Sequence, residues 1–155
     1  MAFVIQDMIN EERMISLNLR RITCAKQLQD ATRDAMALIE DSLTPSLPDM
    51  GLIQEMYDHF KCFLAKQGKP LNANNRKKFL FVAVYLFCPS VLIGHTMPRG
   101  FRDKIKELIN AKSATVVSND VANLLFFYNC YRDFREDVDA AYTYIAGRMN
   151  IAQRT

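Results

Sequence analysis

Glycine and proline, the residues that most often interrupt helices, are confined to short stretches of this chain. Prolines occur at 45, 48, 70, 89 and 98 and glycines at 51, 68, 94, 100 and 147, so residues 1–44 and 101–146 contain neither. Apolar residues in both long segments recur in steps of three and four, which is the period of an α-helix. The sequence therefore predicts an all-α fold, a bundle of five or six helices forming one domain over residues 1–155.

The first uninterrupted segment predicts one long amphipathic helix over residues 1–42, with its ends near Phe3 and Asp41. Its apolar stripe consists of Met8, Ile15, Leu19, Ile22, Leu28, Ala31, Ala35 and Leu38. The spacing slips between Ile22 and Leu28, so the stripe is not a regular heptad repeat. An apolar stripe of this length needs a partner, either the rest of the domain or another chain. A homo-oligomer and a helical protein partner are both compatible with it.

The most apolar stretch predicts the centre of the fold. Residues 79–94 carry no charge, but a bilayer span needs about 20 apolar residues and Pro89 interrupts the run. We therefore expect a buried helix at residues 75–88, apolar on every face over residues 79–88, and no membrane span. The N-terminus lacks a signal-peptide pattern and the four cysteines form no CxxC pair, which favours reduced thiols and a cytoplasmic location in a bacterial host.

The remaining helices surround that central one. A helix is predicted over residues 52–67, and residues 75–149 form the helical core. Within this core a helix runs from Phe101 to Ile109, and one or two more run from Thr115 or Ser118 to Met149. Ser118 is a candidate N-cap, and a bend is expected near residues 132–135. The long helices from both ends of the chain are expected to pack around residues 79–88.

Positive charge is concentrated in the middle third of the chain. Residues 69–112 hold nine basic and two acidic side chains, whereas residues 1–68 hold seven and ten, and residues 113–155 hold four and five. Such a concentration is typical of proteins that bind the phosphate backbone of nucleic acids, although a solvated face balanced by acidic helices would give the same counts. The expected phosphate contacts are Arg76, Lys77, Lys78, Arg99, Arg102, Lys104, Lys106 and Lys112.

Residues 101–126 fit the pattern of a helix-turn-helix, with a first helix at Phe101–Ile109, a turn at residues 110–112 and a second helix from Ser113. The polar residues expected to approach base edges are Ser113, Thr115, Ser118 and Asn119. The run SATVVSND is similar to the start of recognition helices in bacterial helix-turn-helix repressors. This chain departs from that pattern at Lys106, where a small residue is preferred, and at Asn110, where glycine is. Its second helix also becomes apolar from Val121, so ordinary helix packing is the alternative.

Three blocks, RKKFLFVAVYLFCP, MPRGFRDKI and FFYNCYRDFREDVDAAYTYI, resemble small uncharacterised helical proteins of bacteriophages and mobile elements of gut bacteria. This resemblance implies a phage or mobile-element origin and supplies no activity. Two functions suit such a protein. One is a non-enzymatic DNA-binding protein, such as a transcriptional regulator. The other is a structural or assembly protein, such as a virion connector or a helical oligomer, that acts through protein–protein contacts.

No pattern of catalytic residues stands out, so we expect no enzyme, no catalytic residue, no metal site, no cofactor and no small-molecule substrate. His59 is interpreted as a half-buried polar contact. The acidic residues Asp133, Glu136, Asp137 and Asp139 alternate with Arg132 and Arg135, which favours intrahelical ion pairs on a solvated face. The dense aromatic residues from Phe126 to Tyr144 favour core packing or an oligomer interface over stacking on single-stranded bases.

Overall fold

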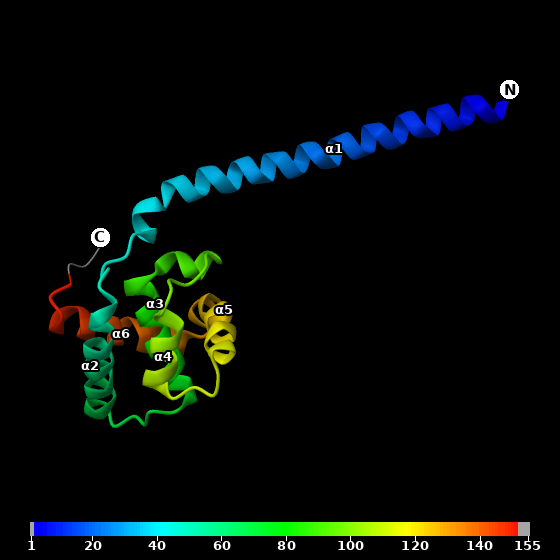
Figure 1. Cartoon of the computed structure of the whole chain (residues 1–155). Coiled ribbons are helices and arrows are strands. Elements are labelled where there is room, and N and C mark those ends of the chain that lie inside the picture. The colour runs from blue at the N-terminus through cyan, green and yellow to red at the C-terminus, as the bar shows by residue number, and fades with distance from the viewer. Residues whose placement is uncertain (1, 152–155) are drawn as a thin grey trace. The chain divides into compact units, whose positions relative to one another are not determined.

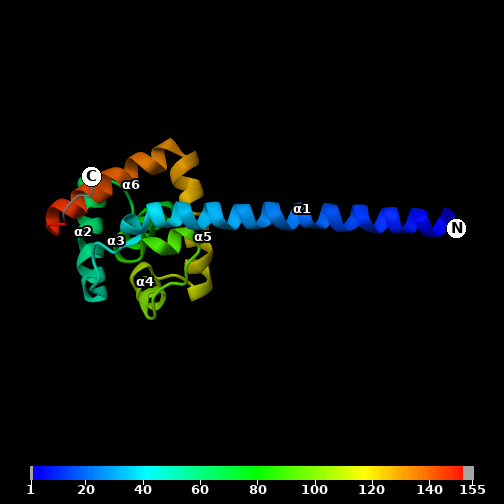
Figure 2. The same ribbon diagram turned by 90° about the horizontal axis from the view of Figure 1, so that it is seen from above.

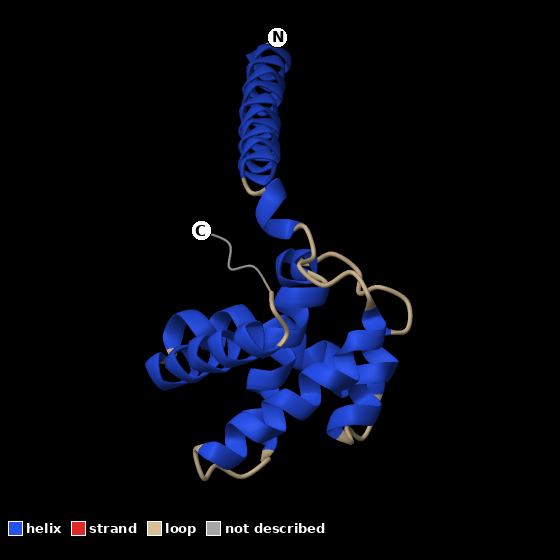
Figure 3. Ribbon diagram, turned by 90° about the vertical axis from the view of Figure 1, so that its left-hand side faces the viewer, coloured by secondary structure: helices blue, strands red, loops and turns tan. Residues whose placement is uncertain are grey.

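The computed structural model describes residues 2–151, and this part of the chain contains helices and loops but no strand (Figure 1, Figure 3). The α-helices are α1 (Ala2–Leu38), α2 (Ile53–Lys66), α3 (Ala73–Phe87), α4 (Phe101–Ile109), α5 (Ala114–Cys130) and α6 (Arg132–Arg148). Three short 3-10 helices are η1 (Glu40–Leu43), η2 (Met50–Leu52) and η3 (Pro89–Ile93). The predicted all-α fold is confirmed. The chain divides into two compact units, residues 1–42 and 43–155.

The first unit is built on α1, a single uninterrupted helix of 37 residues (Figure 2). It ends at Leu38, three residues before the predicted end, and the chain continues into η1. Between residues 4 and 38 only Asp30 and Met36 are half-buried, and every other side chain is exposed. Apolar side chains are spread around the helix, since Met14 and Leu17 lie off the stripe that contains Ile15 and are also exposed.

The second unit is a helical bundle with α3 at its centre. Helix α3 packs against α2, α5, α6 and η3, so it has neighbours on several sides. Ten of its fifteen residues are buried, in agreement with the absence of a polar face over residues 79–87. The predicted central helix is therefore confirmed. The turn after it uses Pro89 as the first residue of η3. Among residues 2–151 no helix has both the length and the apolar character needed to cross a bilayer.

The C-terminal part of the bundle is two helices rather than one long one. Tyr131 has an extended backbone between α5 and α6, so the predicted bend is present and lies one residue earlier than expected. Helix α6 then packs against α2, α3 and α5. The core of this unit takes side chains from α2, α3, η3, α4, α5 and α6.

Candidate nucleic-acid interface

Helix α4 and the turn after it have the geometry that the sequence predicted. The helix spans Phe101–Ile109, and it directs Phe101, Ile105 and Ile109 into the core. Asn110 takes the left-handed conformation, with φ 53°, which asparagine tolerates better than most residues. The backbone N–H of Ala111 then donates to the carbonyl of Lys106 at 3.1 Å. This contact satisfies a carbonyl at the helix end and turns the chain towards α5.

Helix α5 begins at Ala114 and is capped by Ser113, not by Ser118 as predicted. The backbone of Ser113 is extended, and its Oγ accepts a hydrogen bond from the N–H of Val116 at 3.3 Å. Ser118 cannot cap the helix because it already lies inside it, where its hydroxyl donates to the carbonyl of Ala114. The four residues from Asn110 to Ser113 therefore connect α4 to α5, and the two helices pack against each other.

The two sides of α5 differ in polarity over its first half. Val117, Val121 and Leu124 are buried in the bundle. The opposite side exposes Thr115, Asn119, Ala122 and Asn123. The amide of Asn123 donates to the backbone carbonyl of Asn119 at 3.0 Å. Sequence reasoning had missed Asn123, although its position four residues after Asn119 puts both on the same face of a helix.

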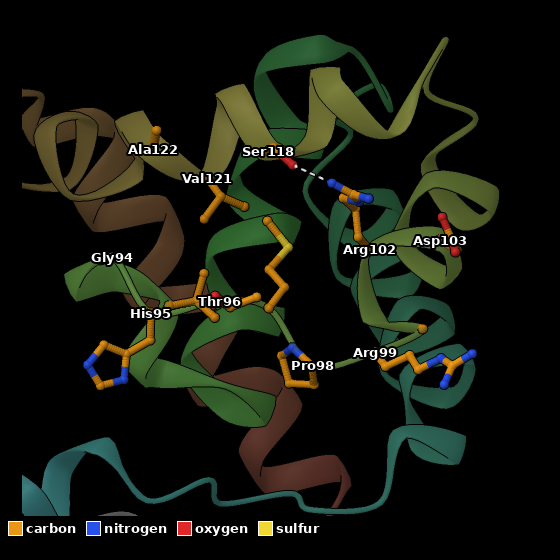
Figure 4. A pocket seen from close by; sticks show the side chains of 13 residues that line it. Gly94, His95, Thr96, Pro98, Arg99, Arg102, Asp103, Ser118, Val121 and Ala122 are labelled. Carbon is orange, nitrogen blue, oxygen red and sulfur yellow. Dashed lines mark hydrogen bonds between the residues drawn. The ribbon is translucent and has the colours of Figure 1, made fainter.

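A surface cavity of about 490 Å³ lies between the segment 94–100, the start of α4 and the middle of α5 (Figure 4). Arg102 of α4 crosses to α5, where its Nη1 donates to the hydroxyl of Ser118 at 3.4 Å. Arg99 and His95 lie on the rim of the same cavity, and both are exposed. Gly100, at φ 85°, makes the sharp entry into α4 that separates the two arginines.

The cations of this region have no carboxylate partner among the described residues. The ion pairs present in residues 2–151 include none with Arg99, Arg102, Lys104, Lys106 or Lys112. Arg99, Arg102 and Lys112 are exposed, while Lys104 and Lys106 are half-buried. Residues 95–119 carry five basic and two acidic side chains. The charge of this surface is therefore available to attract an external anion.

The three cations at the start of α3 have a different environment. Lys78 is 6% exposed, and its ammonium is bound by Asp137 of α6 and by the Asn75 side-chain oxygen. Lys77 lies over the ring of Phe127, with Nζ 5.3 Å from the ring centroid. Arg76 is half-buried. The prediction that Lys78 contacts phosphate is therefore wrong, because its ammonium is buried in the bundle and paired with Asp137.

Asp137 connects two segments that are far apart in sequence. Its carboxylate also accepts a hydrogen bond from Lys69 Nζ at 2.9 Å, so it joins α6 to both the start of α3 and the loop before it. Burial raises the pKa of this carboxyl, but the hydrogen bonds and charges of Lys78 and Lys69 outweigh burial and lower it below its ordinary value. Asn75 completes the cluster by donating to the carbonyl of Pro70 at 2.7 Å.

The other acidic residues of α6 agree only in part with the predicted ion pairs. Arg132 and Glu136 form the expected intrahelical pair at 2.7 Å. Asp137 instead makes the long-range contacts described above. Asp139 accepts a hydrogen bond from the Tyr128 hydroxyl at 2.7 Å. Burial and this carboxylate raise the pKa of Tyr128 to about 12. The interpretation as a purely solvated row of pairs is therefore wrong for these two aspartates, which face α3 and α5 instead.

The aromatic residues of α5 and α6 belong mainly to the bundle. Phe134 is buried, and Tyr128 stacks on Phe81 of α3 with the ring centroids 5.0 Å apart. Phe126 and Tyr131 are more than half exposed and contact each other edge to face. Core packing thus explains most of the aromatic density. His59 is half-buried, as expected, with Nε2 3.6 Å from a Glu55 carboxylate oxygen.

No protein-family model, curated protein or solved structure matches this chain. The resemblances to phage proteins and to helix-turn-helix repressors therefore stay expectations.

Proposed function

We propose that this chain is a non-enzymatic DNA-binding protein of phage or mobile-element type, a transcriptional regulator that docks α4, the turn and the start of α5 onto duplex DNA. The observation that carries the proposal is the contact between Arg102 and Ser118. It holds a guanidinium without a carboxylate partner beside the exposed polar side of α5. A helix-turn-helix needs this combination, since phosphate contacts fix its position and the second helix approaches the bases.

Each part of the surface has a separate role in this proposal. The phosphate contacts are the cations around α4 that have no carboxylate partner among the described residues, namely Arg99, Arg102, Lys104, Lys106 and Lys112. Thr115, Asn119 and Asn123 approach the base edges, and the amide of an asparagine can pair with adenine in the major groove. Ser113 and Ser118 are already engaged by Val116 and Arg102, so they position the helix and the arginine.

The proposal is tested by DNA retention in gel-shift titrations between about 50 and 200 mM salt, where the affinity of a phosphate-contacting protein falls steeply. The double substitution Arg99→Glu and Arg102→Glu should abolish retention. The matched control carries Lys61→Glu and Arg132→Glu, which reverse the charge of two exposed cations of α2 and α6 that already pair with carboxylates. This control makes the same change in net charge, so it should retain DNA more strongly than the first variant. Equal loss in both variants, or no retention by the native chain at low salt, would refute the proposal.

A structural or assembly function is the second candidate, and α1 supports it. Large apolar side chains such as Ile15, Leu19 and Ile22 are more than half exposed on this helix. Exposed apolar surface of this extent is typical of protein-binding sites. Sedimentation of the native chain at increasing concentration tests this function, because an assembly protein should show species heavier than one chain. A single chain mass at all concentrations, with and without candidate partner proteins, would exclude it.

A further inference from the structure

Helix α1 exposes large apolar side chains, and exposed apolar surface is unfavourable for a single helix in water. Ile5, Met8, Ile15, Leu19 and Ile22 are 55–63% exposed. The side-chain contacts described within the helix are few: Thr23 bonds the Leu19 carbonyl, and Arg33 pairs with Asp30. Isolated helices gain little stability in water without tertiary packing of an apolar face. A partner surface that covers these residues would supply that packing.

The exposed residues form a seam with coiled-coil spacing. The α1 seam is defined as Ile5, Met8, Glu12, Ile15, Leu19, Ile22 and Lys26. Its steps alternate between three and four residues, which is the seven-residue pattern that keeps one side of a helix facing another helix. It covers the first two thirds of α1, or roughly 33 Å at 1.5 Å per residue. A second helix with the same spacing therefore fits it, and α1 of a second copy has that spacing.

The two charged seam positions decide the direction of pairing. In a parallel, in-register pair, Glu12 would face Glu12 and Lys26 would face Lys26, so like charges would meet inside the interface. In an antiparallel pair with Met8 opposite the second copy's Leu19, Ile5 faces Ile22 and Glu12 faces Ile15. Lys26 then lies at the N-terminal end of the second copy's α1, far from the second copy's Lys26. In this antiparallel register the Glu12 side chains of the two copies lie in adjacent layers, about 4.5 Å apart along the helix axis, instead of directly opposite each other.

Charges beside the seam favour the same register. Helix α1 is acidic at Asp7, Glu11 and Glu12 and basic at Arg13, Arg20 and Arg21. The antiparallel register brings Asp7 of each copy within one residue of the level of the second copy's Arg21, on the same side of the pair. It also places Glu12 within one turn of the second copy's Arg13. Opposite charges therefore meet at Asp7 and Arg21 near both ends of the contact. At its centre each Glu12 lies close to the second copy's Arg13, although the two Arg13 also approach each other there. Such charge pairs set register and orientation in paired helices.

We propose that α1 is a self-association element that pairs antiparallel with α1 of a second copy, with Met8 opposite Leu19. The pairing deepens the assembly function proposed as the second candidate, on which it rests, and it is independent of DNA binding. It covers Ile5, Met8, Ile15, Leu19 and Ile22 of both chains at once. The symmetric contact closes on itself, so it limits the assembly formed through α1 to two copies.

Disulfide cross-linking in the full chain tests the direction. The exposed Cys24, Cys62 and Cys130 are first replaced by serine, while buried Cys88 stays. A mixture of a Met8→Cys chain and a Leu19→Cys chain should form a covalent dimer on oxidation, and each chain alone should not. A parallel pair would instead link Met8→Cys to itself, and that result would overturn the proposal. Asn10→Cys mixed with Leu17→Cys is the matched control, because these positions are at the same level but lie on the outer side of the helix.

Sedimentation of the native chain and two charge variants tests the seam itself. Ile15→Glu should reduce a dimer to single chains, whereas Leu17→Glu, which adds the same charge on the outer side, should leave it paired. A native chain that sediments as a single copy throughout the micromolar range overturns the proposal, as does equal dissociation by both variants. If single chains still retain DNA, the DNA-binding function survives the failure of this inference. If an added protein covers α1 instead, the assembly function survives without self-pairing.

Discussion

The cations at the start of α3 and those around α4 come from one basic stretch of sequence, but the fold treats them differently. Lys78 is buried and bound by Asp137, and Lys77 covers the ring of Phe127. Arg99 and Arg102 line a surface cavity and have no carboxylate partner in residues 2–151. The cations of this stretch are close in sequence, but they do not form one binding face. Lys77 and Lys78 of α3 make contacts within the bundle, and the cations of α4 remain available to an external anion.

The largest expected effect breaks the cluster at α3. Replacing Asp137 with alanine leaves the buried ammonium of Lys78 without its carboxylate, and an uncompensated buried charge lowers the free energy of unfolding by about 3 kcal/mol. Urea denaturation measures this change. Asp103→Ala, at an exposed aspartate beside the α4 arginines, is the control and should change stability by less than about 0.5 kcal/mol. Equal effects of the two substitutions would contradict the claim that Asp137 stabilises the bundle and Asp103 does not.

The second prediction separates the regions by DNA affinity. Arg102→Gln should reduce the slope of log affinity against log salt by about 0.9, the contribution of one phosphate contact, with little change in unfolding. Lys78→Gln should leave the slope unchanged and lower the free energy of unfolding by about 1–3 kcal/mol, because Asp137 loses a charged hydrogen bond. Salt titrations and denaturation of both variants provide the measurement. A reduced slope for Lys78→Gln alone would reverse the assignment of the two cations.

A smaller effect concerns the serines that position α5. Ser113→Ala removes the N-cap and should cost about 1 kcal/mol of stability. Ser118→Ala loses two long contacts, one from Arg102 and one to the Ala114 carbonyl, and should cost less than about 0.5 kcal/mol while weakening DNA retention. Thermal unfolding of both variants gives the comparison. If Ser118→Ala were the more destabilising of the two, the helix would begin later than Ala114.

The smallest expected effect is the pH dependence of the α3 cluster. The pKa of Asp137 is lowered in the folded state, so its contribution is complete above the unfolded-state pKa of about 3.9 and is lost as the pH falls through the folded-state pKa. The stability difference between the native chain and Asp137→Asn should therefore shrink below about pH 4. Denaturation across this acidic range measures it, with Asp103→Asn as the control. A difference that grows on acidification would mean that the pKa is raised.

Local structure was predictable wherever it depended on neighbours in sequence. The bounds of α4, the left-handed Asn110 and the break before α6 follow from breakers, capping chemistry and apolar spacing. The central helix was predictable because a helix that is apolar on every face must be surrounded. The capping serine was misplaced, since Ser113 and Ser118 both precede apolar helical spacing. Only the observed start of the helix distinguishes them.

The sequence by itself determined that this chain is helical, where its uncharged centre lies, and which third of it carries the positive charge. Tertiary structure alone decided which of those charges remain available. Lys78 and Asp137 are 59 positions apart, and they meet only because α6 packs beside α3. Burial removes water from an ammonium, so the ion requires a partner wherever the fold places it. Arg102 is not buried and needs no carboxylate partner, because α4 directs it across a surface cavity towards Ser118.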